Sequence, residues 1–312
     1  MATATASPNG KLPEIQVGAK TYSELPYDPK DPNTEKLYVE KRVLSMLGGF
    51  LRKGSPVALT GGTGTAKTEL ARAVMNRVKA DVIHQMEFGG ITSGDQLDGM
   101  FILENGETKH LPSEHLKAVR AAAAGARVGY VQDELNRGSA FGINKLLRLY
   151  AKPYEYVSDI DGVLQVPREN LITVATLNVG FGFTGTTKVD AAVANRYRAI
   201  KLELPPAQIL GRILQERFDG IDTDAVNAIC KIYEASQNSD DSYQLNVRDA
   251  IGIAEGIQYS SVDLVEAIEI LVGGSAALNG LPEEAVEGVI TTAKSVYRGK
   301  GKSRGTSKTA ST

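Results

Sequence analysis

One short segment restricts the fold of this chain more than any other feature of its sequence. Val57-Ala58-Leu59-Thr60 has the length and apolar character of a buried strand, and it runs directly into a glycine-rich loop. Leu70, Ala73, Val74 and Val78 then recur at the spacing of one helix face. A strand, a glycine loop and a helix in this order predict an α/β fold with the loop at a strand end.

The loop has the composition of a phosphate cradle. Its residues are Gly61, Gly62, Thr63, Gly64, Thr65, Ala66, Lys67 and Thr68. A triphosphate requires many inward-pointing N–H donors, and a loop without bulky side chains supplies them at a helix N-terminus. In such a loop Lys67 reaches the β- and γ-phosphates, and the Thr68 hydroxyl binds Mg²⁺.

Ala66 departs from this loop pattern, which has glycine before its lysine. Alanine is the smallest replacement, and we expect it to be tolerated because a helix start with negative φ leaves room for a Cβ atom. The alternative is an ordinary glycine-rich turn before a helix that happens to contain Lys-Thr.

A pair of adjacent carboxylates, Asp133 and Glu134, follows the apolar strand Val128-Gly129-Tyr130-Val131. The carboxyl ends of parallel strands meet at one edge of a sheet, so we expect this pair to lie near the loop. Asp133 would hold the metal, and Glu134 would orient and polarise the attacking water. Taken alone, such a pair also fits a helix cap or a solvated turn.

Three further polar residues are candidates for the same site. Asn178 ends a buried strand and would contact the γ-phosphate or the attacking water, although it also fits a turn before Gly180. Arg196 would stabilise the developing charge from a neighbouring subunit, or it is a surface arginine at a helix end. Arg248 begins a helix in the C-terminal part and would reach back to the phosphates.

Strands and helices alternate up to about Pro206, and helices alone follow, which predicts a mostly parallel sheet covered on both faces and then a helical domain. We expect a helix from Glu35, a helix over 139–151, and solvated side chains at His110 and His115. The expected divisions are an irregular lead-in (1–34), an α/β domain (35–205) with hairpins near 101–111 and 154–166, a helical lid (206–298) and a disordered basic tail (299–312).

Composition excludes several classes of protein. A single cysteine rules out a disulfide framework and a cysteine-based zinc cluster, and no apolar run reaches the length of a membrane span. The net charge is −2, from 35 basic and 37 acidic residues. The tail (299–312) holds four basic residues and no acid, so the remaining body has an acidic excess and lacks the footprint of a nucleic-acid binder. We expect a cytoplasmic protein that does not bind membranes.

The loop from Gly61 to Thr68, followed by Asp133-Glu134-Leu135-Asn136-Arg137, resembles the AAA+ ATPases, and specifically their MoxR branch. Several MoxR members also have alanine before the loop lysine. The stretch from Val174 to Gly185 is similar to the sensor-1 region of the CbbQ and CobS subgroups. The segment ending in Asn195-Arg196-Tyr197 looks like the arginine finger of the family, and Arg248 looks like the start of its sensor-2 helix.

The resemblance implies a homo-hexameric ring, with a spiral or filament as the other geometries. Each ATP would lie between subunits, held by Lys67, Thr68, Asp133, Glu134 and Asn178 of one protomer and Arg196 of the next. Members of this branch remodel a protein client, often with a von Willebrand factor A-type partner, which would here be a separate chain. A chelatase motor, a nucleic-acid motor and a nucleotide-gated scaffold are the alternatives.

Overall fold

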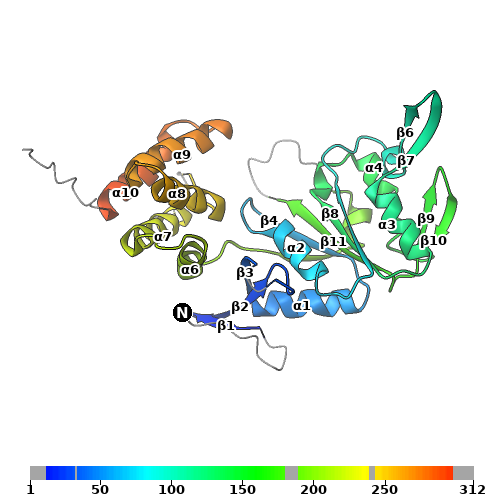
Figure 1. The fold of residues 1–312 in the computed structure, drawn as a ribbon, viewed down its shortest axis with the longest axis horizontal. Coiled ribbons are helices and arrows are strands. Elements are labelled where there is room, and N and C mark those ends of the chain that lie inside the picture. The colour runs from blue at the N-terminus through cyan, green and yellow to red at the C-terminus, as the bar shows by residue number, and fades with distance from the viewer. Residues whose placement is uncertain (1–11, 32–33, 180–188, 239–242, 298–312) are drawn as a thin grey trace, which may run out of the picture. The chain divides into compact units, whose positions relative to one another are not determined.

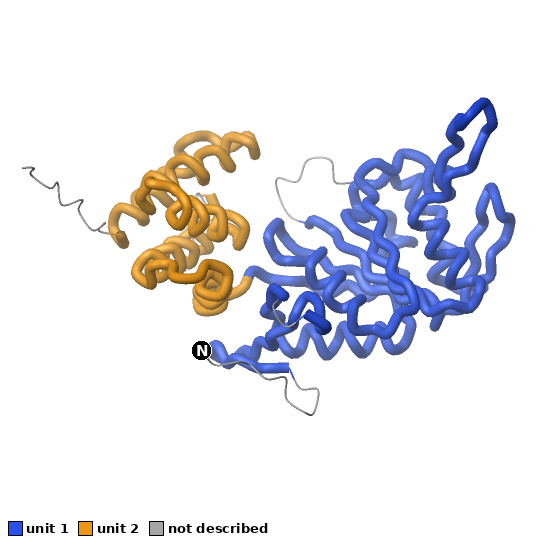
Figure 2. The backbone as a smooth tube through the Cα atoms, in the orientation of Figure 1, with its two compact units in different colours: residues 1–204 blue, residues 205–312 orange. Residues whose placement is uncertain are grey.

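The computed structural model describes residues 12–31, 34–179, 189–238 and 243–297 (Figure 1). The chain divides into two compact units, residues 1–204 and residues 205–312 (Figure 2). The division lies one residue before the boundary expected from the change in sequence pattern. No helix in the described ranges has the length and apolarity needed to cross a membrane.

A five-stranded parallel sheet forms the centre of the first unit, as expected. Its strands stand in the order β12-β4-β11-β8-β5, so the first strand of the sheet along the chain lies inside it rather than at an edge. The bounds are β4 (Val57–Gly61), β5 (Val82–Glu87), β8 (Val128–Asp133), β11 (Leu171–Asn178) and β12 (Arg198–Lys201).

Helices cover both faces of this sheet, because successive strand residues point to opposite sides. Val57 and Leu59 share a buried cluster with α1 (Lys41–Arg52) and α2 (Lys67–Met75). Ala58, between them, belongs instead to the cluster of α3 (Glu114–Ala123) on the opposite face. Strands buried on both faces explain why β4, β8 and β11 read as continuous apolar runs in the sequence.

The expected irregular lead-in is wrong for residues 14–26. These residues form β1 (Glu14–Val17) and β2 (Lys20–Pro26), which pair antiparallel around a turn at Gly18. The helix expected from Glu35 begins only at Lys41, because Lys36–Glu40 forms β3 and pairs with β2. The apolar residues of this short segment fit a strand as well as a helix, and pairing with β2 decides between them.

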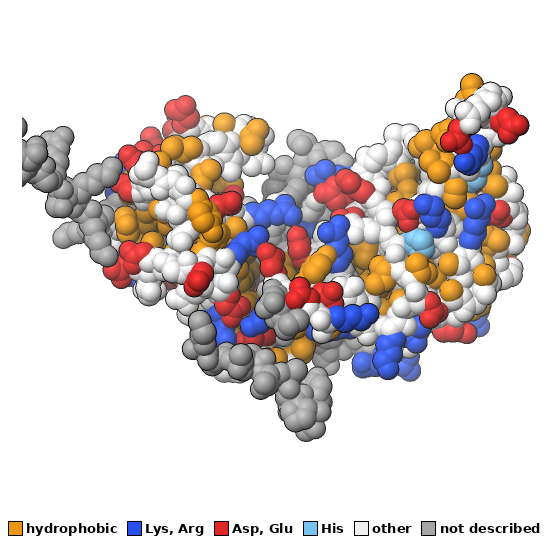
Figure 3. Space-filling view, in the orientation of Figure 1, with side chains coloured by type: hydrophobic (Ala, Val, Ile, Leu, Met, Phe, Trp, Pro, Cys, Tyr) orange, Lys and Arg blue, Asp and Glu red, His pale blue; other side chains and the backbone are white. Residues whose placement is uncertain are grey.

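Two antiparallel hairpins stand at the expected places and project beside α3 (Figure 1). The first contains β6 (Gly99–Glu104) and β7 (Glu107–Pro112), and the second contains β9 (Glu155–Ser158) and β10 (Gly162–Gln165). Figure 3 shows apolar side chains on the first hairpin beside charged ones, and Met100, Phe101 and Leu103 are all exposed.

A buried carboxylate, Asp98, joins the base of the first hairpin to β9 and the turn of the second. It lies directly before β6, and it accepts hydrogen bonds from the Lys145 ammonium at 2.7 Å, the Tyr156 hydroxyl at 2.9 Å and the Asp159 N–H at 2.9 Å. Burial alone would raise the pKa of Asp98, but these bonds, with that from Lys145 the strongest, hold it below its ordinary value. Lys145 also pairs with Asp159 at 2.6 Å.

His115 is completely buried on α3, so the expectation that it is solvated is wrong. Its Nδ1 lies 3.0 Å from the Tyr130 hydroxyl, and its ring packs edge-on against Tyr156. The second ring nitrogen, Nε2, is buried without a partner among the described residues. Burial disfavours the imidazolium and lowers the pKa of His115 to about 3.

The helix expected over 139–151 is also shorter than its apolar spacing indicates. Helix α4 covers Ala140–Asn144, and the chain continues in turns whose N–H groups bond three residues back, as from Leu146 to Ile143. Side chains at three-residue spacing line up on either kind of turn, so the pattern alone does not distinguish them. Three shorter elements complete the unit, namely η1 (Gly94–Leu97), η2 (Leu135–Arg137) and α5 (Ala191–Ala194).

The second unit is helical over its described residues, as expected from the change of pattern near Pro206. Side-chain caps begin several of its helices, and Asn246 and Asp263 each form a reciprocal capping box. The helices are α6 (Ala207–Arg217), α7 (Thr223–Gln237), α8 (Val247–Tyr259), α9 (Leu264–Leu278) and α10 (Glu284–Val296). The stretch after Val179 in the sensor-1-like segment and the basic tail lie outside the described residues.

Candidate functional site

The predicted site residues meet at the carboxyl-terminal edge of the sheet. β4 ends at Gly61, where the loop begins, and Gly61 pairs in register with Asn178 at the end of β11. β8 is the neighbour of β11 on its other side and ends at Asp133. Parallel α/β sheets bind their ligands at the carboxyl ends of their strands. The loop lies at this edge, after β4, which stands inside the sheet between β11 and β12.

The lysine of the loop is held inside it. Lys67 is only 8% exposed, and its Nζ atom donates to the carbonyl oxygens of Gly61 at 3.0 Å and Gly62 at 2.7 Å. The Thr65 hydroxyl lies 3.4 Å from the same nitrogen. The ammonium therefore sits within the loop, against the carbonyl oxygens of the first two loop glycines.

Ala66 does not adopt the negative φ expected of it. Its backbone is left-handed, with φ 56° and ψ 33°, and it precedes the first residue of α2. This conformation brings Cβ close to the following carbonyl oxygen in any residue other than glycine. Gly61 and Gly64 also have positive φ, so the loop places three such residues within six positions.

Asp133 is connected to the loop by a direct hydrogen bond. Its Oδ1 atom accepts from the Thr68 hydroxyl at 2.8 Å and from the Thr176 hydroxyl at 2.5 Å. Gln85 lies 3.4 Å from the other carboxylate oxygen, and Arg72 in turn donates to the Gln85 amide oxygen at 2.6 Å. The carboxylate and the Thr68 hydroxyl, the two groups expected to hold a metal, are thus in contact.

Glu134 has a left-handed backbone, with φ 52°, that turns the chain out of β8. Its N–H donates to the Thr176 hydroxyl at 3.0 Å. One carboxylate oxygen accepts from the Asn178 amide at 3.2 Å, and the other lies 3.1 Å from an Arg137 nitrogen. Asn178, expected to contact phosphate or water, therefore contacts the carboxylate that was expected to orient that water.

A second amide fixes the relative position of these two strand ends. Asn136 donates from its side chain to the Asn178 carbonyl at 2.7 Å and accepts from the Asn178 N–H at 3.3 Å. The side chain of Asn136 is buried. These bonds hold the three-residue helix η2, which carries Arg137, against β11. The partners of Glu134, Asn178 and Arg137, are therefore fixed relative to each other without a ligand.

These residues fit a magnesium nucleotide. Mg²⁺ takes oxygen ligands and is usually bound by one or two protein groups together with substrate phosphates and water. Thr68 and Asp133 supply such groups, and no cluster of three or more His, Cys, Asp or Glu side chains that could hold a metal occurs in the described ranges. The loop supplies backbone N–H groups and Lys67 for the phosphates.

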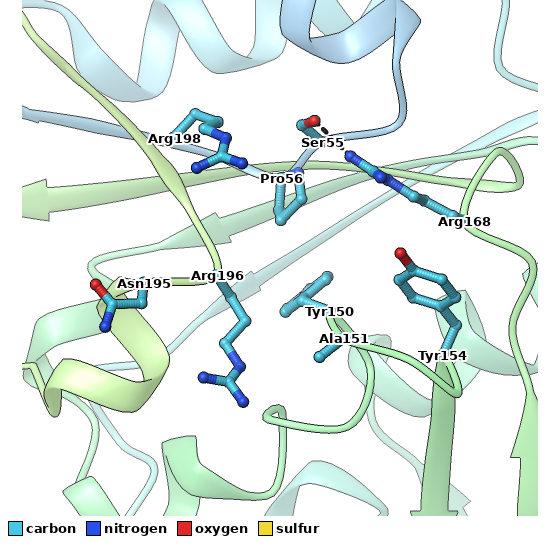
Figure 4. Close-up of a pocket in the computed structure, with 9 residues that line it drawn as sticks. All are labelled: Ser55, Pro56, Tyr150, Ala151, Tyr154, Arg168, Asn195, Arg196 and Arg198. Atoms are coloured by element: carbon cyan, nitrogen blue, oxygen red, sulfur yellow. Dashed lines mark hydrogen bonds between the residues drawn. The ribbon is translucent and has the colours of Figure 1, made fainter.

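Arg196 lies away from this edge, beside the amino-terminal ends of the strands. It follows α5, and its guanidinium donates to the Ala192 carbonyl at 2.5 Å. It lines a cavity of about 300 Å³ together with Pro56, which precedes β4, and Arg198, the first residue of β12 (Figure 4). Within one protomer the structure therefore does not bring Arg196 to the loop.

Arg248 lies in the second unit, exposed in the first turn of α8. Asn246 caps that helix and accepts from the Arg248 N–H at 2.8 Å. Its expected reach toward the phosphates stays a prediction.

Residues 56–197 match the AAA domain family, dynein-related subfamily. The matched segment begins before β4 and ends at Tyr197, so it includes the loop, Asp133, Glu134, Asn178 and Arg196. Over this segment the chain is similar to AAA domains. The match confirms the expectation of an ATPase of this class. It does not distinguish the MoxR branch from others.

The chain also has a relative among known proteins. A protein of Thauera aromatica named "Putative chaperone BssE" is 25% identical over 187 residues, which cover 58% of this chain and 63% of the relative. The match thus spans less than two thirds of the relative's own length.

Two solved structures are similar at 14% identity each. The RuvB Holliday junction branch migration motor of Thermotoga maritima has a TM-score of 0.47 and covers 81% of this chain and 84% of its own. NtrX of Brucella abortus in complex with ATP has a TM-score of 0.45 and covers 82% of this chain and 67% of its own.

Several residues of the site were not predicted from the sequence. Thr176 contacts both Asp133 and Glu134, Gln85 contacts Asp133, and Arg137 pairs with Glu134. Thr176 and Gln85 sit inside strands, where a polar residue in an apolar run was the available signal. Arg137 lay within the quoted motif but received no role.

Proposed function

We propose that this chain is a Mg²⁺-dependent, ring-forming ATPase of the MoxR type that remodels a protein client. The observation that carries the proposal is the contact between Thr68 and Asp133 at 2.8 Å, with Glu134 and Asn178 at the same sheet edge. A metal-holding pair, a water-orienting carboxylate and a phosphate loop together are the parts that phosphoryl transfer to water requires.

The roles proposed for the residues of one protomer follow from their positions. The loop N–H groups and Lys67 bind the phosphates, and Thr68 and Asp133 hold the metal. When bound, Mg²⁺ neutralises charge on the phosphate oxygens. Glu134 orients a water and takes its proton as the oxygen attacks the γ-phosphorus and the bond to the β-phosphate oxygen breaks. Asn178 positions Glu134 through its amide at 3.2 Å.

A neighbouring copy completes the proposed site. Arg196 does not approach the loop of its own protomer, so we assign it to the nucleotide of the next subunit. The proposed assembly is a homo-hexamer, with a spiral or filament as other arrangements of the same contact. Arg248 is proposed to report the nucleotide state to the helical unit.

The client is proposed to be a protein, since the relative from Thauera aromatica carries the name of a chaperone. A von Willebrand factor A-type chain is the proposed partner, on the resemblance to the MoxR branch alone. The proposed location is the cytoplasm.

The test is the variant Glu134→Gln, which keeps the size of the side chain and removes its basicity. We expect ATP binding to persist, while turnover falls by about 10²-fold or more because the general base is lost. The control is Glu169→Gln, an exposed carboxylate before β11 at the opposite end of the sheet. Wild-type protein without ATPase activity, or a Glu134→Gln variant with full activity, would show that the proposal is wrong.

The same variant tests the proposed client. A chain that binds ATP without hydrolysing it is expected to retain its client, so tagged Glu134→Gln protein should capture from its native cell extract a protein that wild type releases. The matched comparison is Lys67→Ala, which lacks the phosphate contact. Identical capture by both variants would contradict an ATP-dependent client.

A further inference from the structure

The cavity beside Arg196 has an unusual lining. Arg168, Arg196 and Arg198 all contribute to its wall, and none of its other lining residues is acidic; these are Ser55, Pro56, Tyr150, Ala151, Tyr154 and Asn195. Its volume of about 300 Å³ is at the lower end of small-molecule sites. Three guanidinium groups around one cavity give it a positive potential that favours an anion.

Two of these arginines flank a buried tyrosine at the entry to β12. Tyr197 is buried, and its hydroxyl donates to the Gln132 amide oxygen at 2.7 Å, inside the core. Arg198 begins β12 directly after Tyr197 and is exposed. Arg196 lies in the turn that follows α5, where its N–H bonds to the Val193 carbonyl at 2.9 Å. This anchoring fixes both arginines at the entry to β12.

Arg168 reaches the same cavity from the segment before β11. Its Nε atom donates to the Gly54 carbonyl at 2.8 Å, and a terminal nitrogen donates to the Ser55 hydroxyl at 2.5 Å. Figure 4 shows its guanidinium beside Ser55, with the Tyr154 hydroxyl turned toward it. The planar fork is therefore held in place with donors to spare, which is how arginine presents itself to phosphate.

One donor of the cluster is buried and lacks an acceptor. The Nε atom of Arg196 has no hydrogen-bond partner among the described residues, although a terminal nitrogen of the same side chain bonds to Ala192. A buried N–H on a charged group is costly to leave unpaired, so an acceptor belongs beside it.

We propose that this cavity is a site for phosphate oxygens, built by Arg168, Arg196 and Arg198. Arg196 has the trans role described above, and the new element is that Arg168 and Arg198 bind the same anion. Phosphate oxygens are the acceptors best matched to several guanidinium forks. The anion is either a free phosphate compound or the terminal phosphates of a nucleotide on a second copy, in which case the inference rests on the proposed function.

The first experiment uses tripolyphosphate and the Lys67→Ala chain, whose phosphate loop is impaired. Calorimetric titration is made at concentrations where light scattering shows single chains. We expect binding that Arg168→Gln and Arg198→Gln, each added to Lys67→Ala, weaken by about tenfold, the effect of one lost charge-assisted bond. Arg52→Gln, an exposed arginine on α1 outside the cavity, is the control and should not change the affinity. This result supports the site with a free phosphate compound as its ligand.

The second experiment tests the nucleotide of a second copy as the source. Lys67→Ala protein has an intact cavity and an impaired loop, and Arg168→Gln protein has the reverse. ATP turnover in a mixture that exceeds the sum of the two separate proteins supports the site with this source. Circular dichroism verifies that each variant is folded.

The proposal is overturned if tripolyphosphate binding is absent or insensitive to both cavity arginines and the mixture also shows no recovery. The first experiment needs no ATPase activity, so an inactive wild type would defeat the proposed function without deciding the cavity. Active wild type with neither effect would defeat the cavity alone.

Discussion

Ala66 is the clearest case of a residue that keeps an unfavourable backbone for its position. Its left-handed conformation, with φ 56°, costs about 1–2 kcal/mol relative to glycine. The conformation orients the loop directly before α2, where Lys67 begins the helix. Glu134 has the same kind of backbone at φ 52°, so both strained residues flank the predicted phosphate and metal positions.

Ala66→Gly is expected to stabilise the folded chain. Glycine removes the left-handed strain but adds freedom to the unfolded chain, so the net gain is about 0.5–1 kcal/mol. Chemical denaturation measures this difference. Ala121→Gly, within the regular helix α3, is the control and should instead destabilise by about 1 kcal/mol. A loss of stability in Ala66→Gly would contradict the left-handed backbone.

His115 makes stability depend on pH in a defined window. The unfolded chain takes up a proton near the ordinary histidine pKa of 6.5, whereas the folded chain resists protonation down to a pKa of about 3. Stability is therefore complete above pH 6.5 and falls between pH 6.5 and 3, by about 2 kcal/mol at pH 5.

The measurement is the free energy of unfolding at pH 7 and pH 5 for wild type and for His115→Phe. In His115→Phe the free energy of unfolding is expected to fall much less between pH 7 and pH 5, because the side chain at position 115 then takes up no proton on unfolding. His110→Phe, on the partly exposed β7, serves as the control. An unchanged slope in His115→Phe would show that other groups cause the decline.

The residues of the site were predictable where a local motif defines them. Lys67, Thr68 and Asp133 follow from a loop and a strand end, each within a few positions along the chain. Thr176 could not be predicted in this way, because its contact with Asp133 depends on the register of β11 against β8. Ala66 shows a different limit. Its place in the loop was predictable, but its left-handed backbone could not be inferred from its residue type.

At the scale of elements, the hairpins depend on two glycines in different ways. Gly99, at the base of β6, has φ 121°, and a Cβ atom there would lie 2.2 Å from the Leu111 carbonyl oxygen. Gly106 sits in the turn with φ 82°, and a Cβ atom there would meet nothing within 4 Å. The first position combines strain with a close approach of backbone, and the second has strain alone.

Gly99→Ala is therefore expected to disrupt the first hairpin, at a cost of about 3 kcal/mol or more, whereas Gly106→Ala costs about 1 kcal/mol. Amide hydrogen exchange over residues 99–112 is the measurement. Protection should fall sharply in Gly99→Ala and only slightly in Gly106→Ala. Equal protection in the two variants would contradict the close approach at Leu111.

The sequence predicted elements where apolar runs or turns are strong, and missed them where two periods compete. The hairpins were predictable from Asn105-Gly106 and Asp161-Gly162, which are strong turn signals. The strand Lys36–Glu40 was not, because Leu37 and Val39 precede the helical series of α1 and fit its spacing. Pairing with β2, a contact between distant parts of the chain, supplies the missing information.

At the scale of the whole molecule, the proposed activity depends on contacts between copies of the chain, which the fold of one copy does not contain. Arg196→Ala is expected to bind ATP normally and to lose about 10³-fold in turnover, as a trans-acting arginine does. Nucleotide-dependent thermal stabilisation measures binding, and phosphate release measures turnover. Arg52→Ala is the control. Retained turnover in Arg196→Ala would place the charge-stabilising group elsewhere.

The division of the chain was predictable from the end of strand patterns near Pro206, because a change of periodicity extends over many residues. The proposed assembly rests on resemblance alone. The role proposed for Arg196 requires a second copy, and no spacing within one chain encodes such a contact.

The buried carboxylate Asp98 has a mechanical consequence. Lys145, Tyr156 and Asp159 all bond to it, so the base of the first hairpin is joined to parts of the second that lie 58 and 61 residues further along the chain. A displacement of β6–β7 must therefore stretch bonds that also hold β9–β10. We expect the two hairpins to move together rather than independently.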